Sequence, residues 1–299
     1  MKFEKGVSNM ATTLAERMSK FSGSPTSALI AKVAELKQQG KDIISLNVGE
    51  PDFGTPDYIK VAGMKAIADN FTKYTPGNGI LELRQGIVKK LKQDNGIEYG
   101  LNEITTSVGA KQAIASAMMV IAGPGDEVIL PIPCWVSYTE MIRLAGATPV
   151  FVPVRPDNYE LDLKAIEDAI TPRTKAIIIC TPNNPTGAVY SEESLRKLAE
   201  LAVKHDFFIV ADEIYEKLVY DGAKHFSVAS ISQEVKERTV TVNGFSKAYA
   251  MTGWRIGYAA ARPDVIKGIM AVQSQTTSAT SFISQKAAAA ALRGPQHDM

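Results

Sequence analysis

Cysteine is scarce in this chain of 299 residues: Cys134 and Cys180 are the two, far apart and not in CxxC spacing. Disulfide-stapled secreted proteins are rich in cysteine, so the sequence indicates a reducing compartment, by default the cytoplasm. A charge excess is also lacking, because 33 basic residues stand against 32 acidic residues, a net charge of +1. Since like charges form no block along the chain, neither nucleic acid nor a membrane surface is a predicted partner.

Long apolar runs are lacking as well. The longest, residues 113–123, is interrupted by Ser116, and the first ten residues mix charged side chains with few apolar ones. The sequence therefore predicts neither a signal peptide nor a membrane-spanning helix. With 45% hydrophobic and 22% charged residues, the composition is typical of a globular chain that can form one large core or two unequal ones.

Helical and strand-like patterns alternate along the sequence. Helices are predicted at residues 27–40, 55–70, 111–122, 162–170, 191–205 and 287–292. Short apolar runs predict strands at residues 42–48, 127–130, 148–152, 176–180, 207–211 and 239–242, and a segment rich in Ser and Thr predicts a loop at 274–281. This alternation predicts an α/β fold with a largely parallel, buried sheet.

Chemically unusual residues follow three of the predicted strands. Asn184, Asp212 and Lys247 lie one to five residues beyond the end of an apolar run. Ligands of open α/β sheets bind beyond the carboxyl ends of the strands. The sequence therefore predicts that an amide, a carboxylate and an amine meet at one edge of the sheet.

Each of these features also has a simpler interpretation. Residues 183–187, Asn-Asn-Pro-Thr-Gly, are typical of a turn. Asp212 is also typical of a helix N-cap, and Lys247 of a solvated surface residue. Their occurrence at successive strand ends favours a site, because a buried amine and a buried carboxylate are costly unless something pairs with them.

Seven ordered motifs resemble those of the fold type I pyridoxal-phosphate enzymes, and within them the class I aminotransferases of the bacterial aspartate aminotransferase branch. In chain order they are NVGEPDF (47–53), KYTPGNG (73–79), SVGAKQA (107–113), PCWVSY (133–138), PNNPTG (182–187), ADEIY (211–215) and SKAYAMTGWRIGY (246–258). The resemblance extends over essentially the whole chain. It implies a three-layer α/β sandwich with a mostly parallel central sheet, an incomplete small domain, and pyridoxal 5'-phosphate as cofactor.

The resemblance implies a role for each residue at the strand ends. Lys247 would hold the cofactor aldehyde covalently and, once the substrate amine has displaced it, move the α-proton. Asp212 would face the pyridine nitrogen and favour the protonated ring, which accepts electrons from the substrate. Tyr215 and Asn184 would hydrogen-bond the phenolic oxygen, and Trp135 would stack on the cofactor. For the two aromatic residues, ordinary core packing is the alternative.

The cofactor phosphate is predicted to bind at the start of the helix that begins near residue 111. Gly109, Ala110 and Lys111 would offer backbone N–H groups at the positive end of the helix dipole, and the small residues permit close approach. Ser246 would add a hydroxyl and Arg255 a guanidinium. No metal site is predicted.

Substrate recognition is implied by resemblance. Gly49 would present its backbone to the substrate carboxylate, Ser24 belongs to a segment that would close over the site, and Trp135 and Asn184 would also contact substrate. Lys111 is similar to a lysine that binds the distal carboxylate of a dicarboxylic substrate; alternatively, it is an exposed first-turn residue. Aspartate and 2-oxoglutarate are thus the favoured amino acid and 2-oxo acid.

The resemblance also implies domains and partners. Residues 1–50 are predicted to form an N-terminal arm and part of a small domain, residues 51–292 the large cofactor-binding domain, and residues 293–299 the start of a truncated C-terminal segment. Family members carry an arginine for the substrate α-carboxylate in that segment, and the context of Arg293 does not match it. Tyr74 resembles a tyrosine that reaches the phosphate of a neighbouring subunit, which implies a homodimer with shared active sites.

The predicted function is therefore ping-pong transfer of an amino group between an amino acid and a 2-oxo acid. Two alternatives stay open. In the first, the chain is a truncated fragment that holds cofactor with little activity. In the second, it is an enzyme that catalyses another fold type I reaction, such as that of a lyase, with the same cofactor residues.

Overall fold

The computed structural model describes residues 14–15, 18–19, 21–23, 25–46 and 48–296. The chain divides into two compact units, Met1–Glu50 and Pro51–Met299. The first unit contains the helix α1 (Pro25–Gln38), which is followed by Gly40 in the left-handed region at φ +78°. A glycine is suited to this position because it has no Cβ to clash with the backbone.

Two of the expectations for local structure are wrong. Residues 41–46 and 48 form no strand, and the side chains of Ile44 and Leu46 are 86% and 91% exposed. Apolar residues stabilise a strand when they pack against neighbouring side chains, and these two exposed side chains have little such packing. The loop predicted at 274–281 is helical in its first part, because the helix α9 (Pro263–Thr276) continues through Thr276.

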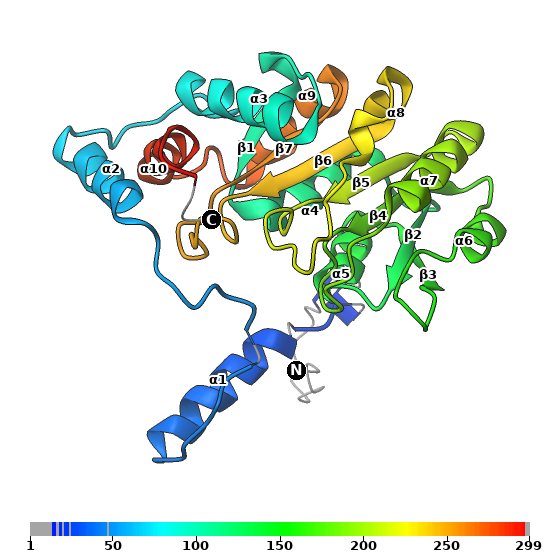
Figure 1. Cartoon of the computed structure of the whole chain (residues 1–299), viewed down its shortest axis with the longest axis horizontal. Helices are drawn as coiled ribbons and strands as arrows, with labels where there is room; N and C mark the ends of the chain where they lie inside the picture. Colours follow the sequence, from blue (N-terminus) through cyan, green and yellow to red (C-terminus); the bar gives the residue numbers. More distant parts are fainter. Residues whose placement is uncertain (1–13, 16–17, 20, 24, 47, 297–299) are drawn as a thin grey trace. The chain divides into compact units, whose positions relative to one another are not determined.

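A mixed sheet forms the centre of the second unit, with seven strands in the described part of the chain (Figure 1). In spatial order the strands are β1 (Ile104–Ser107), β7 (Gly257–Ala260), β6 (Thr239–Gly244), β5 (Phe208–Asp212), β4 (Thr174–Cys180), β2 (Glu127–Ile132) and β3 (Thr148–Pro153). β7 is antiparallel to both its neighbours, and every other pairing is parallel. The predicted, mostly parallel sheet is confirmed.

Helices cover both faces of the sheet. They are α2 (Asp57–Ala68), α3 (Leu81–Asn95), α4 (Gly109–Ile121), α5 (Ser137–Leu144), α6 (Leu163–Ala169), α7 (Glu192–His205), α8 (Gln233–Arg238), α9 and α10 (Phe282–Arg293). Side chains alternate along the buried strands: Ile178 packs with residues of α4, α5 and α9, whereas Ile177 and Ile179 pack with residues of α6, α7 and α8. The three-layer α/β arrangement is therefore also confirmed.

A third buried cluster joins α2, α3 and α10 to the strands β1 and β7. α10 contributes four buried alanines to this cluster, and it packs on α2, as Figure 1 shows. Small side chains allow two helices to approach closely. In the part of the chain that is described, every helix is too short or too polar to cross a lipid bilayer.

The strand directions decide which residues share one edge of the sheet. β1, β4, β5 and β6 run the same way, so the segments after Ser107, Cys180, Asp212 and Gly244 all leave from one edge. Because β7 runs the opposite way, the residues that precede it, including Arg255, reach the same edge. This edge carries the candidate site.

Candidate active site

Asp212 is the last residue of β5 and is 3% exposed. Its Oδ2 accepts a 2.6 Å hydrogen bond from the Tyr138 hydroxyl, and its Oδ1 accepts a 3.2 Å bond from the Ile214 backbone N–H. Burial raises the pKa of Asp212 from 3.8 to about 6, although both hydrogen bonds and the charge of Lys247 lower it. A cation beside this carboxylate would favour its ionised form.

The N-cap interpretation of Asp212 holds in part. Its Oδ1 receives the Ile214 N–H as a capping residue does, but residues 214–217 form a turn and not a helix. The other carboxylate oxygen is bonded to Tyr138, so the side chain also has a partner far away in the sequence.

Tyr215, Asn184 and Lys247 lie together beside Asp212. The Asn184 Nδ2 donates a 3.1 Å hydrogen bond to the Tyr215 hydroxyl, and the Lys247 Nζ lies 5.6 Å from the centroid of the Tyr215 ring. Burial raises the pKa of Tyr215 to about 12. The amide, the carboxylate and the amine at the ends of β4, β5 and β6 thus form one group around the Tyr215 ring.

The segment that carries Asn184 is also a turn. The Asn183 Oδ1 accepts hydrogen bonds from the Thr186 backbone N–H at 3.2 Å and from the Thr186 hydroxyl at 2.9 Å. Asn183 is buried and Asn184 is half-buried, so the two adjacent amides have different environments. Asn183 holds the turn, which leaves the Asn184 amide directed at Tyr215.

An aromatic group borders the site next to α5. The rings of Trp135 and Tyr138 meet edge to face, 5.3 Å apart at an interplanar angle of 90°. Trp135 and Tyr215 are partly buried and pack against the core, so the alternative of ordinary core packing holds in part for both rings. Tyr138 was not predicted as a site residue. Its position three residues after Trp135 was the available signal, but its bond to Asp212 depends on a distant contact.

Glycines bring the start of α4 against the end of the Lys247 loop. Gly109 has φ +75°, and a Cβ there would lie 3.0 Å from the Arg255 Cζ. A Cβ on Gly257 would lie 2.6 Å from the Ala110 backbone nitrogen. Since the first-turn N–H groups of a helix lack partners within the helix and carry partial positive charge, this cradle favours an anion.

Two cations adjoin the cradle. Arg255 is held by hydrogen bonds from Nη1 to the Thr252 carbonyl at 2.8 Å and from Nη2 to the Val108 carbonyl at 3.4 Å. Partial burial and the charge of Arg255 lower the pKa of Lys111, whose Nζ lies 4.8 Å from the Trp135 ring centroid. Lys111 is an exposed residue in the first turn of α4, which agrees with the alternative to a substrate contact. It nevertheless lies beside both Arg255 and Trp135.

The remaining predicted residues differ in where they lie. Ser246 is buried in the turn after β6, two residues beyond Gly244, which pairs with Gly257. Tyr74 is 90% exposed and meets the Phe282 ring edge to face at 6.4 Å. Gly49 belongs to the first unit, where it is exposed, and Ser24 lies outside the described residues.

Comparison with known proteins gives consistent matches. The family model "Aminotransferase class I and II" matches residues 41–299. The aspartate aminotransferase of Bacillus sp. (strain YM-2) is 48% identical over 288 residues, which cover 96% of this chain and 74% of that relative. A probable aspartate/prephenate aminotransferase of Thermus aquaticus is 47% identical over 287 residues, with 96% and 74% covered. The structure of the Thermus thermophilus aspartate aminotransferase with maleate matches with a TM-score of 0.91 at 47% identity, covering 94% of this chain and 73% of that one.

The fold and the site together define a pyridoxal-phosphate-dependent enzyme of fold type I. The chain belongs to the class I and II aminotransferase family. Pyridoxal 5'-phosphate is accordingly its cofactor, and the residues present fit that molecule. The buried Asp212 carboxylate suits a protonated ring nitrogen, and the cradle at Gly109, which a Cβ would fill, suits a phosphate.

Proposed function

We propose that this aminotransferase moves the amino group of aspartate to 2-oxoglutarate by a ping-pong mechanism, in the cytoplasm. The observation that carries the choice of a dicarboxylic substrate is Lys111, a cation beside Arg255 and Trp135 at the edge where the amine of Lys247 lies. A distal carboxylate would pair with such a cation. The relatives named aspartate aminotransferase and the Thermus thermophilus enzyme solved with maleate, a dicarboxylate, support the proposal.

Three residues would carry the chemistry. When bound, pyridoxal 5'-phosphate supplies an aldehyde and an electron sink. Lys247 would hold the aldehyde covalently through Nζ and, after the substrate amine has displaced it, would take the proton from the substrate Cα and return it. Asp212 would keep the ring nitrogen protonated, and the Tyr215 hydroxyl, oriented by the Asn184 amide, would bond the phenolic oxygen.

The other site residues would bind and orient. The backbone N–H groups of Gly109 and Ala110, the Ser246 hydroxyl and the Arg255 guanidinium would hold the phosphate. Trp135 would cover one face of the cofactor ring. For the substrate, we keep Trp135, Asn184 and Lys111 as proposed contacts, together with Gly49 and Ser24 of the N-terminal part of the chain.

We also propose that the enzyme is a homodimer with shared active sites. Val61, Met64 and Ile67 lie three residues apart on α2 and are 55%, 61% and 54% exposed, which makes an apolar stripe. Tyr74, which follows the same helix, is 90% exposed. In a homodimer built on this stripe, we propose that Tyr74 reaches the phosphate site of the second copy, as the resemblance implies.

The Lys247→Ala variant tests the central role. Covalent attachment of the cofactor, measured by the mass of the chain after borohydride reduction, should be lost. Turnover of aspartate to oxaloacetate should fall by roughly 10⁴-fold, the upper range of general acid–base catalysis, while some noncovalent binding remains. Lys267→Ala, which removes an exposed lysine of α9, is the matched control and should behave as the parent. Turnover by Lys247→Ala at the parental rate would reject the assignment.

The products formed by the parent protein decide between this function and the alternatives. A shift of the visible absorption band with aspartate, accompanied by oxaloacetate, supports the proposed reaction. Ammonia or another elimination product indicates a lyase, and cofactor binding with no response to any amino acid indicates a cofactor-holding unit. Prephenate should be compared with 2-oxoglutarate as acceptor, because some relatives are named for both aspartate and prephenate.

A further inference from the structure

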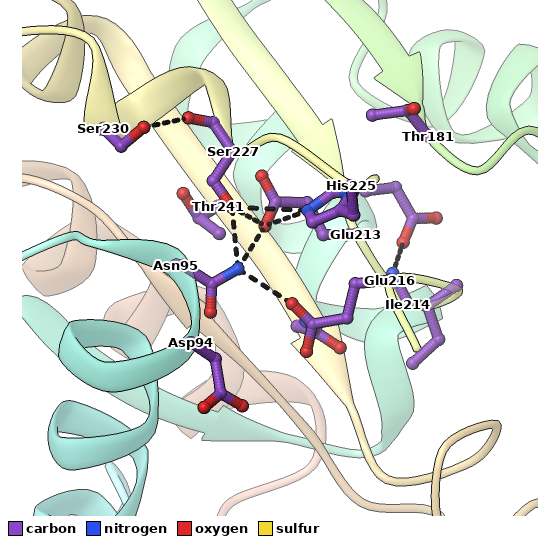
Figure 2. A network of polar contacts seen from close by, with 12 residues as sticks. Asp94, Asn95, Thr181, Glu213, Ile214, Glu216, His225, Ser227, Ser230 and Thr241 are labelled. Carbon is purple, nitrogen blue, oxygen red and sulfur yellow. Dashed lines mark hydrogen bonds and ion pairs between the residues drawn. The ribbon is translucent and has the colours of Figure 1, made fainter. Parts of the chain in front are cut away.

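Figure 2 shows a second polar cluster, which contains Glu213 and Glu216. These two residues directly follow Asp212 and Tyr215 in the chain. The second cluster is called the Glu213 cluster below. Its side chains come from the end of α3, from the turn after β5 and from the loop that follows that turn, and they are Lys90, Asn95, Glu213, Glu216, His225 and Ser227. The proposed chemistry uses none of them directly.

Glu213 is the most deeply buried member, with a side chain 1% exposed. Its Oε2 accepts hydrogen bonds from the Ser227 hydroxyl at 2.7 Å and from the Asn95 Nδ2 at 3.2 Å, and lies 3.2 Å from the His225 Nε2. Burial lowers the pKa of His225, but the bond to Glu213 and the negative charges around it raise it overall. The charges of Glu213 and Glu216 therefore favour the protonated form of His225.

Glu216 is bound by the same Asn95 side chain that donates to Glu213. Its Oε2 accepts a 2.8 Å hydrogen bond from the Asn95 Nδ2, and its Oε1 is ion-paired with the Lys90 Nζ. Lys90 also donates to the Asn95 Oδ1 at 2.7 Å. One amide group thus stands between the two glutamates, and the burial of these side chains makes each lost donor costly.

The three side chains with metal-ligating atoms, Glu213, Glu216 and His225, lie within 4.8 Å of one another. Their geometry alone does not make a metal site, because the two carboxylates already accept bonds from Asn95, Ser227 and Lys90. Lys90 supplies a cation from the protein itself. The cluster is better described as a network of protein groups.

The network and the active site share one short piece of backbone. Glu213 directly follows Asp212, and its N–H donates a 2.8 Å bond to the Val242 carbonyl of β6. Glu216 directly follows Tyr215, and its N–H bonds to the Glu213 carbonyl at 3.0 Å. Neighbouring side chains therefore alternate between the two sides: Asp212 and Tyr215 contact site residues, and Glu213 and Glu216 contact the cluster.

We propose that Asn95, Glu213 and Glu216 are positioning residues that set the orientation of the Asp212 carboxylate and the Tyr215 hydroxyl. A single peptide unit separates each glutamate from its neighbour in the site, so a glutamate that moves rotates that neighbour. Loss of the shared Asn95 donor would leave two buried carboxylates underbonded and free to shift. The inference rests on the proposed roles of Asp212 and Tyr215, whose groups must be held closely to act on a bound ring.

The test compares variants of the whole chain loaded with pyridoxal 5'-phosphate. Asn95→Ala should raise the apparent Kd for the cofactor by about 10-fold, by analogy with metal sites, where loss of a residue that supports a ligand has an effect of this order. It should also move the pH midpoint of the visible absorption band by about half a unit, because Asp212 and Tyr215 surround the absorbing group. If Asn95→Ala does not fold, Glu213→Gln, which keeps the shape of the side chain, decides on the same two measurements.

Two reference variants make the result specific. Glu127→Gln removes a carboxylate that is buried and bonded to Arg173 at 3.0 Å, at the opposite end of the sheet, and should lower the melting temperature without changing Kd or midpoint. A cluster variant that behaves in the same way shows a structural role only and overturns the inference. Asp212→Asn should itself move the midpoint; if it does not, the role of Asp212 fails first, and the inference fails with it.

Discussion

Asp212 is the residue at which stability and function oppose each other. Burial raises its pKa in the folded protein to about 6, whereas the ordinary value is 3.8. Below pH 3.8 the carboxyl is protonated in both the folded and the unfolded chain, so its ionisation does not lower the free energy of unfolding. As the pH rises from 3.8 to 6, the unfolded chain releases the proton first, so this group progressively destabilises the cofactor-free protein.

Asp212→Asn should therefore stabilise the cofactor-free protein at neutral pH. The rise of the pKa from 3.8 to about 6 corresponds to about 3 kcal/mol in the free energy of unfolding, reached above pH 6 and absent below pH 4. Urea unfolding of parent and variant at pH values on both sides of this pKa of about 6 measures the difference in the free energy of unfolding. Curves that stay parallel across these pH values would contradict the burial of an ionised carboxylate. The same substitution should slow the reaction, because the ring nitrogen loses its anionic partner.

At the scale of elements, the sequence predicted best where the signal is local. The strands β4, β5 and β6 were predicted from the apolar runs 176–180 and 207–211 and from the Thr–Val alternation at 239–242, and almost all of these residues are buried. Their order in the chain, with polar residues after each, was sufficient to group Asn184, Asp212 and Lys247. Parallel strands expose their carboxyl ends at one edge, so the grouping follows from topology.

Elements that depend on distant partners were missed. β1 and β7 are four residues each, and they pair Ile104 with Ala260, so neither strand is recognisable without the other. α3 was missed for a different reason: Leu83, Ile87 and Leu91 have a helical spacing, but they lie within a segment rich in charged and polar residues. The contact of Tyr138 with Asp212 also joins residues far apart in the sequence. For this reason the motif that includes Tyr138 did not predict a role for that residue.

The junction between α4 and β7 gives a prediction about phosphate binding. In Gly109→Ala the added Cβ would press on the Arg255 guanidinium, and the backbone at φ +75° would be strained. The apparent Kd for pyridoxal 5'-phosphate should rise by about 10-fold or more, because the anion loses close approach to the backbone. The Kd for pyridoxal, which has no phosphate, should change little.

Gly125→Ala is the matched control for this substitution. Gly125 also has a positive φ, of +92°, but its Cβ would meet nothing within 4 Å. It therefore adds the backbone strain without the contact. Equal loss of phosphate affinity in both variants would show that strain, and not the cradle, is responsible.

At the scale of the whole molecule, the stripe of α2 gives a prediction about assembly. Met64→Glu places a charge in the middle of the apolar stripe formed with Val61 and Ile67. If a second copy covers this stripe, the dimer dissociation constant should rise by about 100-fold, because an unpaired charge would be buried. Sedimentation over a concentration series measures it, and Lys89→Glu, on an exposed position of α3, is the control. An unchanged dissociation constant in Met64→Glu would place the interface elsewhere.

The loop between β6 and β7 has a consequence for how the protein unfolds. It contains both Lys247 and Arg255, which are eight positions apart and would hold the aldehyde and the phosphate of one cofactor molecule. Several of the other proposed contacts come from the ends of β1, β4 and β5, which are far away along the chain. A bound cofactor would thus act as a cross-link between four strands that are otherwise joined by hydrogen bonds and packing. Loading should therefore make the opening of these strands more cooperative, so that hydrogen exchange slows in all four together.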